Sequence, residues 1–139
     1  EVVVLKSFGK FWGLAGLRLG FAIARPDTLA LLAEALGPWP VSGPALAIGA
    51  AALADRDWAE ATRERLARDA ARLDAAMASH GRCVGGTTLF RLYDVGDAAA
   101  MRDRLASARI WSRTFPYSRG WLRLGLPPAA GWDRLERAL

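Results

Sequence analysis

Lys10 is the residue of this chain best suited to act as a chemically reactive amine. Residues 2–5 read Val-Val-Val-Leu, a run typical of a strand covered on both faces. We therefore expect Lys10 to emerge at the carboxyl end of a buried strand, where open α/β sheets place their ligands. The neighbouring Phe8, Phe11 and Trp12 would exclude water from its ammonium group, and desolvation lowers the pKa of a lysine. Such an amine can form a Schiff base with a carbonyl group.

Ser7 and Arg18 are suited to bind a phosphate group near that lysine. A hydroxyl and a guanidinium both donate hydrogen bonds to phosphate oxygens, and the guanidinium can donate two at once. Glycines at positions 9, 13 and 16 allow a ligand to approach the backbone closely. The carbonyl partner of Lys10 is then a substrate or pyridoxal phosphate. A solvated turn is the alternative, but no acidic residue occurs between Glu1 and Asp27.

The spacing of these residues resembles the motif of the fold-type I pyridoxal-phosphate enzymes in the class I and II aminotransferase group. That motif is a serine, two residues, the cofactor lysine, a Gly-Leu-Ala-Gly-like run, an arginine and a glycine. Ser7, Lys10, residues 13–16, Arg18 and Gly20 fit it. The resemblance implies that Lys10 holds pyridoxal phosphate as an internal aldimine and that Ser7 and Arg18 bind its phosphate. Many members have a serine or threonine directly before the lysine, where this sequence has glycine.

Length and composition exclude several classes of protein. The 139 residues are 53% hydrophobic and 24% charged, which is ordinary for a globular domain and unlike a disordered or membrane-spanning chain. The net charge of +5 is compatible with a nucleic-acid partner, but acidic and basic residues alternate over residues 56–74, as on a solvated helix face. His80 and Cys83 are the only residues of their types, so we expect no metal site and no internal disulfide, and a reducing cytoplasm fits. Because the chain opens directly into a strand, we expect it to be the carboxyl-terminal piece of a longer protein.

The hydrophobic pattern predicts an α/β fold with two domains. In residues 1–54 we expect a strand over 19–24, a helix over 26–36 and a buried alanine-rich helix from the cap Ser42 to Leu53. In residues 55–139 we expect a long amphipathic helix over 55–79, strands over 84–93, 110–115 and 121–126, and helices over 97–108 and 129–139. The buried stripe of the long helix would hold Trp58, Thr62, Leu66, Ala70, Leu73 and Met77. The resemblance implies that the first part ends the large cofactor-binding domain, whose sheet is mainly parallel, and that the second is a small carboxyl-terminal α/β domain.

Arg113 and Arg123 are candidates for binding an anionic substrate. Strand alternation places each beside aromatic residues on one face of its strand, without an adjacent carboxylate. Both could clamp an anionic group, or both could extend into solvent from an edge strand. The resemblance implies that Arg123, in the Leu-Arg-Leu-Gly segment 122–125, binds the substrate α-carboxylate. Arg113 lies about where histidinol-phosphate aminotransferases carry an arginine that contacts the substrate phosphate.

Within the group, residues 7–13, 37–44 and 121–127 are most similar to the threonine-phosphate decarboxylases of cobalamin biosynthesis. The resemblance implies decarboxylation of L-threonine O-3-phosphate to (R)-1-aminopropan-2-yl phosphate through a Schiff base at Lys10. It also implies a homodimer with a small phosphorylated amino acid as substrate, and no nucleic-acid or membrane partner. A pyridoxal-phosphate-dependent aminotransferase such as histidinol-phosphate aminotransferase is the alternative, and a basic nucleic-acid-binding module is a third hypothesis. The family's other cofactor-binding groups precede the lysine and cannot be located here, so we expect these residues alone to be inactive.

Overall fold

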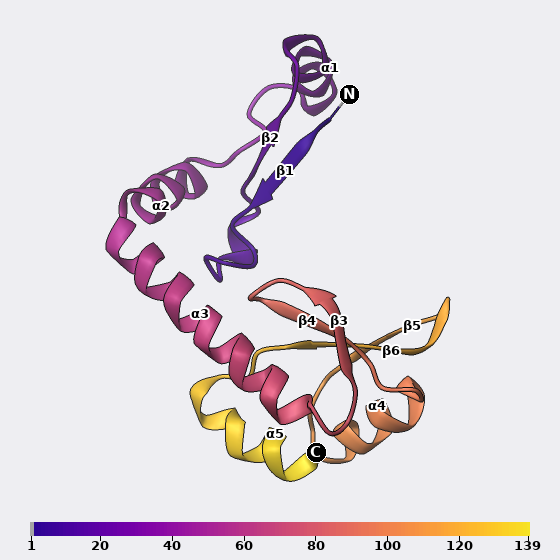
Figure 1. The fold of residues 1–139 in the computed structure, drawn as a ribbon. Coiled ribbons are helices and arrows are strands. Elements are labelled where there is room, and N and C mark those ends of the chain that lie inside the picture. The colour runs from indigo at the N-terminus through magenta and orange to yellow at the C-terminus, as the bar shows by residue number, and fades with distance from the viewer. Residues whose placement is uncertain (1) are drawn as a thin grey trace. The chain divides into compact units, whose positions relative to one another are not determined.

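The computed structural model describes residues 2–139, so the expected start of the first domain at Glu1 lies outside the described residues. Contacts divide the chain into two compact units, Glu1–Trp58 and Ala59–Leu139. The first unit contains β1 (Val4–Ser7), η1 (Ala15–Leu17), β2 (Gly20–Ile23), α1 (Pro26–Leu36) and α2 (Gly43–Ala54), and α3 (Arg56–Met77) begins at its end (Figure 1). The second unit continues with β3 (Arg82–Gly86), β4 (Phe90–Asp94), α4 (Ala98–Ser107), β5 (Arg113–Phe115), β6 (Ser118–Gly125), η2 (Ala129–Gly131) and α5 (Trp132–Ala138).

Strands β1 and β2 form an antiparallel pair, with Ser7 opposite Gly20. The part of the chain described here contains no parallel strand pair, so it does not include the parallel portion of the expected sheet. The expectation of a strand buried on both faces is wrong for this chain, because every residue of β1 is exposed, Leu5 to 77%. Among the described residues, β1 makes its main contacts with β2, and its side chains remain largely exposed.

Helix α2 begins where the sequence predicts. The Ser42 hydroxyl accepts a hydrogen bond from the backbone N–H of Ala45 at 3.3 Å, which caps the first turn. Ala45 packs with Phe8 and Leu19 in the small core of this unit. The expectation that α2 is buried is wrong for most of its surface, because only Ala45 and Gly49 are buried. The apolar composition of the helix therefore exceeds what the described residues cover.

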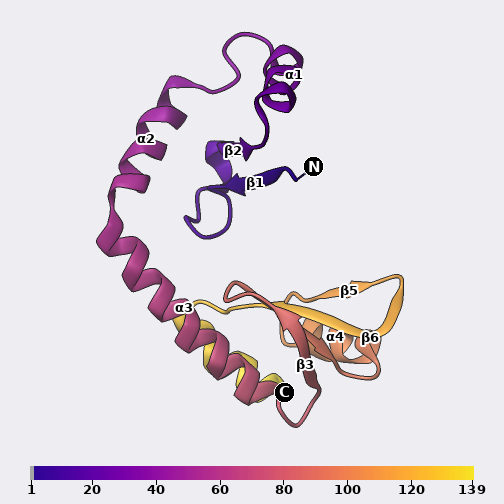
Figure 2. The ribbon, with the colours of Figure 1, turned by 45° about the horizontal axis from the view of Figure 1, so that its top comes forward.

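The second unit is a four-stranded antiparallel sheet in the order β3-β4-β6-β5, with helices on one face (Figures 1 and 2). The inward side chains of β4 and β6, Tyr93, Leu122 and Leu124, join a core with residues of α3, α4 and α5. Periodicity predicted the buried stripe of α3 correctly from Thr62 to Met77. It was wrong for Trp58, which is 42% exposed, while Ala59 is buried.

The predicted single strand over 84–93 is two strands joined by a tight turn. Gly86 has φ +133°, a conformation that side chains rarely adopt, and the backbone N–H of Thr87 donates to the carbonyl of Phe90 at 2.7 Å. The chain therefore reverses at this glycine instead of continuing. The predicted helix over 129–139 is also divided, into η2 and α5. Within the described residues, no helix is both long and apolar enough to cross a membrane.

Candidate functional site

The loop after β1 folds back on itself and forms a small cavity. The backbone N–H of Phe8 donates to the carbonyl of Leu19 at 3.2 Å, and that of Leu14 donates to the carbonyl of Phe8 at 2.9 Å. Phe8 is only 1% exposed and anchors the loop. Ser7 and Arg18, eleven positions apart in the sequence numbering, both line the resulting cavity of ≈ 240 Å³, together with Gly9 and Gly20. The structure thus brings together the two residues expected to bind phosphate.

The donors of this cavity fit a phosphate group. The Ser7 hydroxyl oxygen accepts a hydrogen bond from the Gly9 backbone N–H at 2.9 Å, which leaves its own proton free to be donated. Arg18 uses Nη1 to donate to the carbonyl of Ala15 at 2.9 Å, and its other N–H groups can bind a ligand. A Cβ at position 9 would lie 3.2 Å from the Ser7 hydroxyl oxygen, closer than side chains normally approach. Glycine therefore keeps the serine side of the cavity open.

Arg18 adopts an unusual backbone conformation for an arginine, with φ +53° in the left-handed region. This conformation is uncommon for a residue with a Cβ, and strained residues of this kind cluster at ligand sites. The exposed Arg18 lines the same cavity as Ser7, the last residue of β1. The sequence motif predicted the residue but not its conformation.

Lys10 lies in the turn that follows Phe8 and is exposed. Its carbonyl accepts a hydrogen bond from the backbone N–H of Gly13 at 3.0 Å, and Gly13 has φ +68°. The expectation that aromatic neighbours exclude water from the amine is wrong in this structure. Trp12 instead stacks on Trp58, with ring centroids 5.2 Å apart, and Phe8 stacks on Trp12. The aromatic rings pack with one another and leave the Lys10 side chain in solvent.

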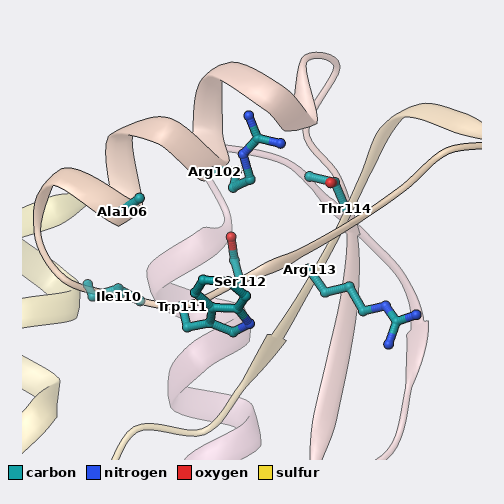
Figure 3. Close-up of a pocket in the computed structure, with 7 residues that line it drawn as sticks. All are labelled: Arg102, Ala106, Ile110, Trp111, Ser112, Arg113 and Thr114. Atoms are coloured by element: carbon teal, nitrogen blue, oxygen red, sulfur yellow. The ribbon is translucent and has the colours of Figure 1, made fainter.

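Arg113 and Arg123 lie directly opposite each other on neighbouring antiparallel strands, β5 and β6. Residues opposite each other in such a pair project from the same face of the sheet. Here it is the face away from the helices, since the adjacent Leu122 and Leu124 are buried on the helix side. Figure 3 shows the Arg113 side chain extending away from Ser112 and Thr114, as strand alternation requires. The sequence identified both arginines, but their register could be obtained only from the structure.

Each of these two arginines lies over an aromatic ring. The guanidinium carbon of Arg123 is 4.7 Å from the ring centroid of Phe90, and that of Arg113 is 5.7 Å from the centroid of Phe115. Among the described residues, neither guanidinium forms an ion pair with a carboxylate. Two unneutralised cations directly across a strand pair repel each other, so this face favours an anionic ligand.

A charged network that the sequence did not suggest joins α3 to β4. Arg91 donates from Nε and Nη2 to the Asp74 carboxylate at 3.0 and 2.6 Å, and the Tyr93 hydroxyl donates to the same carboxylate at 2.7 Å. Hydrogen bonds from Arg91 hold the pKa of Asp74 below its usual value. Burial, followed by the bond to Asp74, raises the pKa of Tyr93. The one sequence feature that could have indicated this network is the alternation that places Arg91 and Tyr93 on the same face of a strand.

A second cavity, of ≈ 580 Å³, lies between α4 and β5 (Figure 3). Arg102, Ser112, Arg113 and Thr114 are among its lining residues. The buried Ser112 hydroxyl has no hydrogen-bond partner among residues 2–139. Arg102 donates hydrogen bonds from Nε and Nη2 to the carboxylate of the neighbouring Asp103 at 2.9 and 2.8 Å, so the charge of Arg102 is already compensated. The uncompensated arginine side chain, that of Arg113, points to the other side of the strand. This cavity is therefore less suited to an anion than the face that carries Arg123.

The fold is that of pyridoxal-phosphate-dependent aminotransferases. A solved histidinol-phosphate aminotransferase from Sinorhizobium meliloti, in complex with pyridoxal-5'-phosphate, matches 99% of this chain with a TM-score of 0.85 and 27% sequence identity. The chain covers 40% of that protein. The family model for aminotransferase class I and II matches residues 1–139. The chain belongs to this family.

Two curated relatives carry the name threonine-phosphate decarboxylase. One, from Sinorhizobium sp, is 48% identical over 135 residues, and the other, from Pseudomonas aeruginosa, is 45% identical over 140 residues. The alignments cover 96% and 99% of this chain but only 40% and 42% of the relatives. The chain therefore spans about two fifths of the length of the curated relatives that it matches.

The cavity at Arg18 leads to a first prediction. Arg18→Gly removes the guanidinium and suits the left-handed backbone, so we expect weaker pyridoxal phosphate binding without a loss of fold. Losing a charge-assisted hydrogen bond should lower the affinity by about tenfold or more. Absorbance titration of the intact enzyme with the cofactor measures this change. The control is Arg25→Ala, which removes an exposed arginine paired with Asp27, and an equal loss in both variants would contradict the prediction.

Proposed function

We propose that these residues form the carboxyl-terminal part of a pyridoxal-phosphate-dependent lyase. The enzyme decarboxylates L-threonine O-3-phosphate to (R)-1-aminopropan-2-yl phosphate in cobalamin biosynthesis. The proposal is supported by the identity of 48% and 45% with two threonine-phosphate decarboxylases over nearly the whole chain. The structural observation that carries it is the register of Arg113 opposite Arg123. Two adjacent cations suit a small substrate with two anionic groups, a carboxylate and a phosphate.

The roles of the cofactor-binding residues follow from their chemistry. When bound, pyridoxal phosphate supplies an electron-withdrawing ring that stabilises negative charge at the substrate α-carbon as a bond breaks. Lys10 holds the cofactor through its side-chain amine, and its exposure leaves Nζ accessible for that bond. Ser7 and Arg18 bind the cofactor phosphate through the cavity that they line. Once its amine is free again, Lys10 returns a proton to the α-carbon.

The roles of the two strand arginines are to bind and orient the substrate. Arg123 binds the α-carboxylate and Arg113 binds the phosphate. Fixing both anionic groups determines which bond at the α-carbon is aligned for cleavage, and decarboxylation requires that bond to be the one to the carboxylate. The enzyme acts as a homodimer in the cytoplasm. Because the chain spans two fifths of its relatives, we expect the 139 residues alone to show no measurable turnover.

One assay of the intact enzyme separates this function from the alternative. With L-threonine O-3-phosphate as the only substrate, we expect release of carbon dioxide that does not depend on 2-oxoglutarate. A keto product that forms only when 2-oxoglutarate is added would replace the proposal by an aminotransferase. That alternative is supported by the fold match to a histidinol-phosphate aminotransferase at 27% identity.

A further inference from the structure

The positions of Phe90 and Phe115 relative to the arginine pair suggest a function for the two rings. On β4, Phe90 lies opposite Gly125, toward the carboxyl end of β6 from Arg123. On β5, Phe115 lies opposite Ser118, toward the amino end of β6. The rings therefore lie on opposite sides of the point where Arg113 and Arg123 face each other.

Each ring attracts one guanidinium in its own direction. A cation over an aromatic face is stabilised by the ring's quadrupole, and both distances, 4.7 and 5.7 Å, lie within the range of this interaction. Repulsion between the two guanidiniums also moves them apart, in the same directions as the attractions to the rings. Together these forces favour separation of the two cationic groups.

Core packing does not account for these rings. Neither Phe90 nor Phe115 belongs to the buried core of the second unit, whose large residues are Tyr93, Trp132 and the leucines. Both rings are half-buried on strands of the sheet. Phe115 also contacts the ring of Tyr117, with centroids 5.4 Å apart, which restricts its own movement. A ring held in this way is a fixed support for the neighbouring guanidinium.

We propose that Phe90 and Phe115 are positioning residues that hold the guanidiniums of Arg123 and Arg113 apart, and so determine which spacing of two anionic groups the enzyme accepts. The identity of those groups as a carboxylate and a phosphate rests on the proposed function. The separation of the two guanidiniums depends on the strands and rings of this sheet and not on the identity of those groups. Phe90 and Phe115 therefore select substrates by the distance between the two anionic groups of the substrate.

Matched substitutions test this role without any catalysis. Phe90→Leu and Phe115→Leu keep an apolar side chain but remove the aromatic face, whereas Phe90→Tyr and Phe115→Tyr retain it. Binding of malonate, succinate and glutarate to the intact enzyme, followed by NMR, reports the preferred spacing. We expect the wild-type chain to prefer one length and the leucine variants to lose about two- to fivefold of that preference, the effect of an exposed cation–π contact. The tyrosine variants should retain the preference.

A second NMR readout reports the positioning directly. The side-chain protons of Arg123 should show a ring-current shift that Phe90→Leu removes and Phe90→Tyr preserves. Phe21→Leu, which removes a ring of β2 from the first unit, is the control and should change neither readout. Retention of both the length preference and the ring-current shift in Phe90→Leu would overturn the proposal.

The outcomes separate this inference from the proposed function. If the leucine variants behave as expected and the intact enzyme releases no carbon dioxide from L-threonine O-3-phosphate, the positioning role stands and the proposed function fails. If the enzyme decarboxylates that substrate and Phe90→Leu leaves its KM, its kcat and the dicarboxylate preference unchanged, the positioning role fails.

Discussion

Lys10→Ala should remove nearly all activity of the intact enzyme, lowering kcat by about a thousandfold or more. The substitution removes the amine that we propose holds the cofactor and returns a proton, and acid–base catalysis by a positioned group alone contributes about 10²–10⁴-fold. Borohydride reduction followed by peptide mass analysis measures the covalent link, and carbon dioxide release measures turnover. The wild-type enzyme should carry the reduced cofactor on the peptide that contains Lys10, and the variant should carry none.

Lys6→Ala provides the matched control, because Lys6 and Lys10 are the only lysines of this chain. Lys6 lies on β1 opposite Phe21, is exposed, and has no part in the proposed chemistry. We expect Lys6→Ala to retain both the reduced adduct and most of the activity. An adduct found on Lys6, or full activity in Lys10→Ala, would show that the amine has been assigned to the wrong residue.

Asp74→Ala should destabilise the second unit by about 2–3 kcal/mol in the free energy of unfolding. The substitution leaves Arg91 without its carboxylate and leaves the hydroxyl of Tyr93, which is 1% exposed, without a partner. The Asp74 and Arg91 side chains are 33% and 21% exposed, so the loss is smaller than for a fully buried ion pair. Urea unfolding followed by circular dichroism measures the change.

The same network gives stability a defined dependence on pH. Arg91 lowers the pKa of Asp74 in the folded state, so ionised Asp74 stabilises the fold. This stabilisation is fully present above about pH 4, the ordinary pKa of an aspartate in an unfolded chain. The contribution is lost as the pH falls through the lowered folded-state pKa. When the pH is lowered from 7 to below the folded-state pKa of Asp74, we therefore expect the free energy of unfolding to fall more in the wild type than in Asp74→Ala.

Asp103→Ala is the control for this network. Asp103 pairs with Arg102 at 2.8 Å, but the two side chains are 68% and 46% exposed. Exposed pairs of this kind contribute about 0–1 kcal/mol, so Asp103→Ala should unfold nearly as the wild type does. A loss in Asp74→Ala no larger than in Asp103→Ala would show that the network does not stabilise this unit.

The sequence predicted elements well where the signals were local. Pro26 starts α1 and Ser42 caps α2, and both helices begin where these residues place them. Burial was predicted less well, because it depends on what packs against an element. The apolar runs of β1 and α2 predicted coverage that the described residues do not provide. The hairpin at Gly86 was missed because two short strands separated by a turn resemble one long strand.

In the candidate site too, features set by local sequence were predicted, whereas features set by distant contacts were not. The spacing of Ser7 and Arg18 was enough to predict that they lie together, since both belong to one local segment and line one cavity. That this cavity binds phosphate stays a prediction. Strand alternation gave the face of Arg113 and Arg123 but not their register, which depends on a turn and an irregularity between residues 114 and 115. The Asp74 network was missed because its members are 17 and 19 positions apart.

The exposed apolar side chains of β1 and β2 affect how the two units fold. Residues Ala59–Leu139 enclose a core of their own, so this unit can fold from the contacts that it contains. Within the described residues, β1 and β2 instead leave Val4, Leu5, Phe21 and Ile23 exposed, and an apolar ribbon of this kind favours a covering layer or further strands. Within these residues, the segment that carries Lys10 is therefore stabilised by fewer apolar contacts than the segment that carries the two arginines.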